Sequence, residues 1–137
     1  MRDINRIILH CTATKEGVDV SLETIKNWHL ERGFKDVGYH YVILLNGEIV
    51  LGRNVFTQGA HTRGENEDSI GIAYVGGLDE NGKPKDTMSI FQENAFFHLV
   101  ESLSVTFGKL ELHGHNEYSN KACPSFDVQE KYKFLNR

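Results

Sequence analysis

Apolar positions in the first part of the chain change from strand-like to helical spacing. Residues 6–11 form a short, β-branched apolar run, which predicts a strand. A helix is then expected to begin at Ser21, because a serine hydroxyl can accept hydrogen bonds from the free backbone N–H groups of a first turn. Gly33 can adopt the left-handed conformation that often follows a helix, so we expect the helix to end near it.

The next segment contains a hairpin pattern followed by a long loop. Two apolar runs, at residues 39–45 and 48–51, flank the dipeptide Asn46-Gly47, a strong signal for a two-residue β-hairpin turn. Residues 53–68 contain several glycines and resemble a loop that is too long to be a simple connection. Loops of this length usually carry function or mobility, so this segment is a candidate for part of a binding site.

The second half of the chain contains the clearest helix pattern. Residues 69–75 predict another strand, and Ser89 with Gln92 forms a capping box at the start of a helix that Gly108 should end. The apolar stripe expected on this helix consists of Phe91, Ala95, Leu99 and Leu103. Residues 109–115 alternate between apolar and polar positions, which predicts a half-buried strand before a short terminal helix.

The order of these elements favours an α/β fold. Strands and helices interleave as in a parallel sheet, but the hairpin adds an antiparallel pair. We therefore expect a single mixed central β-sheet with helices packed on its faces. With 137 residues and no repeat or linker, residues 1–137 should form a single domain.

Charge and composition narrow the function classes. The net charge is -4 and the basic residues are scattered, so we expect no nucleic-acid partner. The chain has no apolar run long enough to cross a bilayer and no secretory signal at its N-terminus, so we expect no membrane partner and a protein that is cytoplasmic as synthesised. Cys11 and Cys123 are not needed as a disulfide at this chain length, which leaves free thiols for metal binding or catalysis.

Histidines gather where the first and last predicted strands end. His10 lies near the end of the first strand, His113 and His115 lie near the end of the last, and Cys123 follows in a loop. Strand ends at one rim of an α/β sheet commonly bind ligands, and two imidazoles with one thiolate suit a catalytic zinc. Spacing alone also fits packed histidines and a small buried cysteine, and it does not choose between His113 and His115.

Several separate motifs follow one another over nearly the whole chain. They are ILHCTAT (8–14), WHLERGFKDVGYHY (28–41), NGEIVLGR (46–53), GAH (59–61), NEDSIGI (66–72) and GHNEYSNKACPSFD (114–127). Together and in this order they resemble type 2 N-acetylmuramoyl-L-alanine amidases, the family of short phage lysozymes and animal peptidoglycan-recognition proteins.

The resemblance implies a zinc enzyme that cuts peptidoglycan between N-acetylmuramic acid and the L-alanine of the stem peptide. Matched position by position, the Zn²⁺ ligands are His10, His115 and Cys123, and the catalytic residues are Tyr39 and Lys121. Lys121 is a candidate donor to the oxyanion, whereas Tyr39 could donate to the oxyanion or the leaving amine, or orient the water. The partner would be peptidoglycan, both its glycan strand and its stem peptide, and we expect a monomer.

The other histidines and Cys11 have less specific expectations. His29 and His40 are expected to be structural or to support the metal ligands, and His61 could line the substrate groove. Cys11 follows His10 in a strand, so it should point to the opposite face and be buried and unreactive.

Alternatives from other classes remain open at this point. A peptidoglycan-binding module without activity would be expected to lack one of the ligands, and none is missing. A cysteine hydrolase would use Cys123 as nucleophile and His115 as base. Among amidases, a phage or prophage endolysin that acts on the cell wall after release is favoured over a bacterial wall-recycling enzyme.

Overall fold

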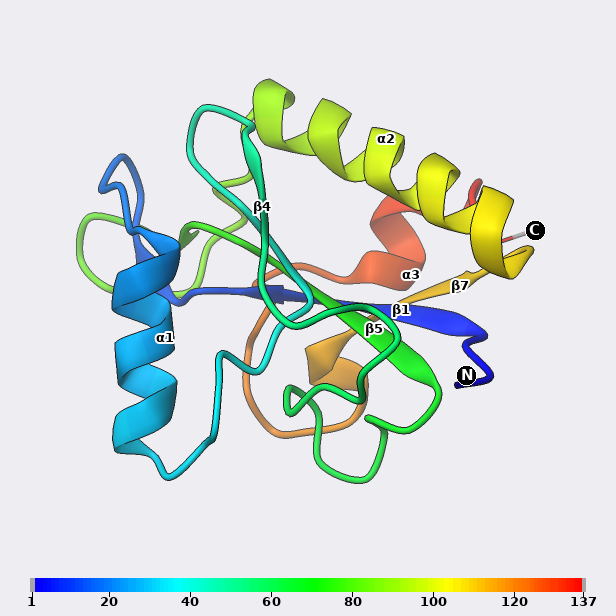
Figure 1. Cartoon of the computed structure of the whole chain (residues 1–137). Helices are drawn as coiled ribbons and strands as arrows, with labels where there is room; N and C mark the ends of the chain where they lie inside the picture. Colours follow the sequence, from blue (N-terminus) through cyan, green and yellow to red (C-terminus); the bar gives the residue numbers. More distant parts are fainter. Residues whose placement is uncertain (1, 137) are drawn as a thin grey trace.

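The computed structural model describes residues 2–136, and its main element there is a five-stranded mixed sheet (Figure 1). The strands of this sheet are β1 (Arg6–Cys11), β3 (Tyr41–Ile43), β4 (Ile49–Leu51), β5 (Ser69–Tyr74) and β7 (Glu111–Gly114). Their order is β4-β3-β5-β1-β7. β1 is parallel to both β5 and β7, β3 is parallel to β5, and the hairpin partners β3 and β4 are antiparallel. The expected mixed sheet is confirmed.

The helices are α1 (Leu22–Glu31), α2 (Ile90–Phe107) and α3 (Val128–Lys131), with a 3₁₀ turn, η1 (His115–Glu117), directly after β7. A second, smaller sheet pairs β2 (Thr14–Lys15) with β6 (Gly77–Leu78). This small sheet was not predicted, because two-residue strands are too short to show a period. Within residues 2–136, no helix is long and apolar enough to span a bilayer.

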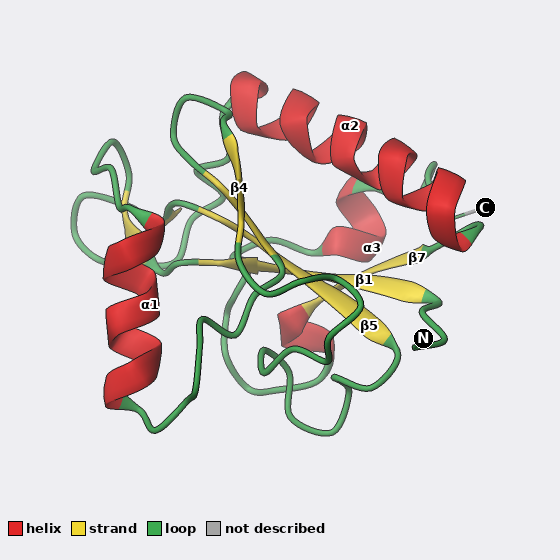
Figure 2. Cartoon of the chain, viewed as in Figure 1, coloured by secondary structure: helices red, strands yellow, loops and turns green. Residues whose placement is uncertain are grey.

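The helices pack on both faces of the sheet, as expected for this fold class. α2 runs across one face of the sheet, with α3 beneath its C-terminal half (Figures 1 and 2). α1 lies at the end of the sheet that is far from the C-terminal end of α2 (Figure 1). Ile7 and Leu9 of β1 belong to the larger core with residues of α2 and α3, whereas Ile25 of α1 packs in a second cluster. Because side chains alternate along a strand, His10 points away from the face that carries Leu9.

The expected helix ends are confirmed. The Ser21 hydroxyl accepts a hydrogen bond from the backbone N–H of Thr24, at 3.2 Å. Ser89 and Gln92 form the reciprocal capping box at the start of α2, and Gly108 follows the helix with φ of 81°. These local signals involve residues close in sequence, so they could be identified without knowledge of the packing.

The expected apolar stripe on α2 is wrong in its first position. Phe91 is 65% exposed, whereas the buried positions of the helix are Gln92, Phe96, Leu99 and Leu103. Gln92 takes the place of an apolar residue because its side-chain amide donates to the carbonyl oxygens of Val75 and Ile43, at 3.0 and 3.4 Å. A buried glutamine that satisfies strand-end carbonyls in this way cannot be recognised by a hydrophobic pattern.

The last strand is shorter than expected. It ends at Gly114, whose backbone N–H donates to the carboxylate of Glu117 at 2.6 Å, and the chain then turns into η1. The strand predicted over residues 109–115 is therefore too long, because His115 already begins the turn. The hairpin is confirmed, but its strands are shorter: β3 ends at Ile43 and β4 begins at Ile49, so the turn is wider than the two residues expected. Tyr39 and His40 precede β3 instead of lying within it.

Candidate metal centre

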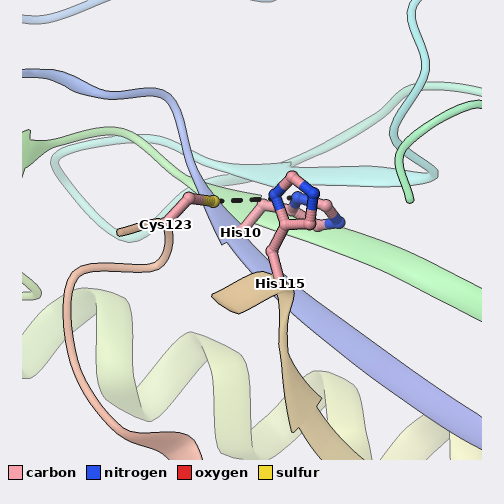
Figure 3. A group of neighbouring side chains, drawn as sticks. All are labelled: His10, His115 and Cys123. Atoms are coloured by element: carbon pink, nitrogen blue, oxygen red, sulfur yellow. Dashed lines mark hydrogen bonds between the residues drawn. The ribbon is translucent and has the colours of Figure 1, made fainter. Parts of the chain in front are cut away.

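Three side chains from separate segments meet at the end of β1 (Figure 3). His10 is the penultimate residue of β1, His115 is the first residue of η1, and Cys123 lies in the loop before α3. One potential ligand atom of each lies within 4.8 Å of the others. Nδ1 of His10 is 3.8 Å from Sγ of Cys123, and the rings of His10 and His115 have centroids 4.5 Å apart. This group contains the three residues that the resemblance implied as ligands.

The donor set fits a metal ion. Within residues 2–136, Nδ1 of His115 is a buried polar atom without a hydrogen-bond partner, which is costly unless something else satisfies it. Two imidazole nitrogens and one thiolate sulfur are the ligands that zinc favours in catalytic sites with an open position. His10, His115 and Cys123 therefore form a possible His-His-Cys metal site.

Electrostatics keep both histidines available as neutral ligands. Burial, with the neighbouring His61 and His115, lowers the pKa of His10 well below its usual value. Burial and the nearby Lys121 charge also lower the pKa of His115. A hydrogen bond with Cys11 and burial raise the pKa of the Cys123 thiol, so a metal ion would have to displace its proton.

Tyr39 and Lys121 have different surroundings near this group. The ring of Tyr39 packs against those of His10 and His29, with centroid distances of 5.1 and 5.2 Å. Burial raises the pKa of Tyr39, so its phenol stays protonated and can act as a hydrogen-bond donor. Lys121 is exposed and lines a cleft of about 610 Å³ together with His115.

That cleft contains several basic side chains. Arg32 and Arg63 line it along with Lys121, and residues 60–63 of the long loop form one wall. Residues 52–68 follow irregular turns between β4 and β5, as expected for the glycine-bearing loop. Among the three candidate ligands, His115 lines this cleft.

Three of the remaining histidines, His29, His40 and His113, are held by hydrogen bonds to groups other than the candidate metal ligands. His113 lies 2.8 Å from Glu117 and 3.0 Å from Glu111, through opposite ring nitrogens. Nδ1 of His29 accepts from the backbone N–H of Gly38 at 2.7 Å. Nδ1 of His40 likewise accepts from a backbone N–H, at 3.0 Å. Each has a structural hydrogen bond that explains its position.

Two contacts of His10 were not expected from the sequence. Its Nε2 lies 2.9 Å from Nδ1 of His61 and 3.2 Å from the hydroxyl of Thr62. His61 was expected only in the groove, which it also lines, and Thr62 was not singled out at all. A threonine in a loop is usually a turn or surface residue, so the sequence carries no signal for Thr62. Cys11 is buried as expected, but its backbone N–H donates to Sγ of Cys123 at 3.1 Å.

The fold and this group define an α/β domain with a possible His-His-Cys metal site beside a cleft. Residues 1–126 match the family model described as N-acetylmuramoyl-L-alanine amidase. The chain therefore belongs to the N-acetylmuramoyl-L-alanine amidase family, and it is an amidase by class. The family resemblance seen in the sequence motifs is confirmed.

Phage proteins and solved amidase structures are among its relatives. The chain is 36% identical to the endolysin of Enterobacteria phage K11, over 96% of this chain and 87% of that protein. It is 38% identical to the endolysin of Escherichia phage T7, over 90% and 82% respectively. The solved structure of the amidase LysC from Clostridium intestinale superimposes with a TM-score of 0.80 at 25% identity, covering 96% of this chain and 87% of LysC.

Proposed function

We propose that this chain is a zinc-dependent endolysin that hydrolyses the amide bond between N-acetylmuramic acid and L-alanine in peptidoglycan. The observation that carries this proposal is the meeting of His10, His115 and Cys123 beside a cleft, with a buried histidine nitrogen that has no partner among residues 2–136. The phage endolysins related to the chain support action on the cell wall after release.

The proposed metal ligands are His10, His115 and Cys123. Zinc held there would polarise the amide carbonyl and lower the pKa of a water molecule toward neutrality. His10 would use Nδ1, because this nitrogen faces Cys123 while Nε2 is engaged by His61. The thiol of Cys123 would lose its proton when the metal enters.

Lys121 and Tyr39 are the proposed catalytic residues. Attack on an amide carbonyl develops negative charge on its oxygen, and a donor placed beforehand stabilises that charge. Lys121 lines the cleft and carries a positive charge that can serve this purpose. The phenol of Tyr39 keeps its proton and its ring packs against His10, so it can donate to the oxyanion or the leaving amine, or orient the water.

The products of peptidoglycan digestion test the reaction. Purified sacculi would be incubated with the protein, and the soluble products analysed by mass spectrometry. We expect free stem peptides that begin with L-alanine, together with glycan strands that lack peptide. The variant His115→Ala is the matched control and should release neither.

Other outcomes of the same experiment would contradict the proposal. A binding module would bind the sacculi and release nothing, and a glycosidase would release disaccharide peptides. A bacterial wall-recycling amidase would cleave soluble muropeptides efficiently while leaving intact sacculi nearly untouched.

A further inference from the structure

A chain of hydrogen bonds leads from the proposed metal ligand His10 back into the protein. Nε2 of His10 lies 2.9 Å from Nδ1 of His61, and Nε2 of His61 lies 3.3 Å from the hydroxyl of Ser69. The Ser69 hydroxyl donates to the backbone carbonyl of Glu65 at 2.7 Å. This series of contacts starts at Nε2 of His10, whereas Cys123 approaches the other ring nitrogen, Nδ1.

The hydrogen bond from Ser69 to Glu65 sets the direction of the other hydrogen bonds. A serine hydroxyl has one hydrogen, and Ser69 donates it to the carbonyl oxygen of Glu65. Ser69 can therefore only accept from Nε2–H of His61. A neutral imidazole carries a single N–H, which makes Nδ1 of His61 an acceptor. Nε2 of His10 must therefore carry the proton, and the lone pair of His10 is then on Nδ1, which lies 3.8 Å from Sγ of Cys123.

The contacts of the Thr62 hydroxyl are compatible with the same hydrogen-bond directions. Its hydroxyl lies 3.0 Å from Nδ1 of His61 and 3.2 Å from Nε2 of His10. It can donate to the former and accept from the latter at the same time. In the opposite tautomer of His10, Nε2 would accept from Nδ1–H of His61, so Nε2 of His61 would carry a lone pair. That lone pair would face an oxygen lone pair of Ser69, unless Ser69 gave up its hydrogen bond to Glu65.

Gly71 of β5 provides the space for the His61 ring. A Cβ atom added at position 71 would lie 2.5 Å from Cγ and 2.8 Å from Nδ1 of His61. The three nearest atoms to such a Cβ all belong to this ring, so an alanine would strike His61 in particular. The backbone of β5 at Gly71 therefore lies directly against the His61 ring. The neighbouring strand β1 carries His10, which pairs with Ala73 of β5.

We propose that His61 is a positioning residue that fixes the Nε2–H tautomer of His10, and so presents the Nδ1 lone pair to the metal. This inference rests on the proposed zinc site. Hydrogen-bond partners of this kind hold the ring of a metal-bound histidine in orientation and raise its basicity, and losing one typically lowers metal affinity about 10- to 100-fold.

The tautomer can be measured without metal. NMR of ¹⁵N-histidine-labelled, metal-free protein distinguishes protonated from unprotonated ring nitrogens. We expect His10 to be protonated at Nε2 in the wild type and in His61→Asn, whose amide oxygen can replace the Nδ1 acceptor. In His61→Leu the two tautomers should mix. A His10 tautomer that is unchanged in folded His61→Leu would overturn the inference.

Zinc affinity, measured by competition with a chelator, provides a second test. We expect His61→Leu and Gly71→Ala each to weaken binding about 10- to 100-fold. His61→Asn and the control His113→Gln should stay near wild type. In the His61→Leu background, Gly71→Ala should lower the zinc affinity little further, because the hydrogen bond from His10 to residue 61 is already lost. If the losses of zinc affinity in His61→Leu and Gly71→Ala added up in the double variant, the two substitutions would not act through the same His61 ring, and this would contradict the inference.

The same measurements separate this inference from the proposed zinc site. If His10→Ala bound zinc as tightly as the wild type, the zinc site itself would be wrong, whatever the tautomer. If His10→Ala lost zinc but His61→Leu kept both the tautomer and the affinity, only the positioning role would be wrong.

Discussion

Lys121 and Tyr39 differ in exposure, and this difference decides how their roles can be tested. Lys121 is exposed on a loop, so its removal should leave the fold intact. Tyr39 packs between His10 and His29, and replacing it with phenylalanine removes the hydroxyl while keeping the ring. Neither side chain is among the proposed metal ligands.

We expect Lys121→Ala and Tyr39→Phe to retain zinc and thermal stability but to lose most turnover. Removing one oxyanion donor typically lowers kcat by about 100- to 1,000-fold. Lys133→Ala, at an exposed lysine near the C-terminus, is the control and should retain the wild-type rate. Hydrolysis of peptidoglycan by Lys121→Ala at the wild-type rate would show that Lys121 is an ordinary surface lysine.

The two histidines near the end of β7 allow a direct comparison. His115 joins His10 and Cys123, whereas His113 bonds to Glu111 and Glu117. We expect His115→Ala to lose bound zinc and His113→Ala to keep about one zinc per chain, as measured by metal analysis after gel filtration. Loss of metal in His113→Ala with retention in His115→Ala would mean that the ligand set is wrong by two residues.

On α2, the side chains of Phe91 and Phe96 have opposite environments. Phe96 is fully buried against the sheet, and Phe91 is 65% exposed. We expect Phe96→Ala to lower the free energy of unfolding by about 3–5 kcal/mol. Phe91→Ala should change it by less than about 0.5 kcal/mol. Urea unfolding of both variants measures this, and similar losses for the two would contradict the buried face assigned to α2.

Much of the element order could be predicted, because it depends on local signals. The run at β1, the serine caps of α1 and α2, and the Asn46-Gly47 turn are each encoded within a few residues. One error arose where a tertiary contact decides: Gln92 is buried because the strand carbonyls of Val75 and Ile43 need a donor. The early end of β7 has a local cause that the apolar pattern does not show, since the Glu117 carboxylate accepts from the backbone N–H of Gly114.

The candidate site was predicted to a similar extent. The resemblance placed His10, His115 and Cys123 together, and the structure brings them within reach of one another, although their roles remain predictions. The hydrogen-bond chain through His61 to Ser69 was not predicted. It depends on side-chain directions across two strands and a loop, which no sequence pattern encodes.

For the whole molecule, buried histidines should make stability depend on pH. Burial lowers the pKa of both His29 and His40 from 6.5 to about 4. Between these values the unfolded chain takes up protons that the native state does not, so the free energy of unfolding should fall as the pH falls from about 6.5 to about 4. Below about pH 4 the loss from these two groups should level off.

Urea unfolding of the metal-free protein across this range measures the effect. The variant His40→Gln should show a shallower dependence on pH, because it lacks one of the groups that resist protonation. His98→Gln, at an exposed histidine on α2, should match the wild type. Equal stability of the wild type at both ends of the range would contradict the neutral, buried state assigned to these histidines.

The account as a whole depends on zinc at the His10–His115–Cys123 group, and one titration tests it directly. Metal would be removed with a strong chelator, and amidase activity on sacculi measured as zinc is added back. We expect a folded protein of lower thermal stability with no activity, and full recovery at one zinc per chain, since the core of the domain does not require the metal. Full activity in the chelator, with loss of activity after thiol alkylation, would contradict the account and favour a cysteine hydrolase.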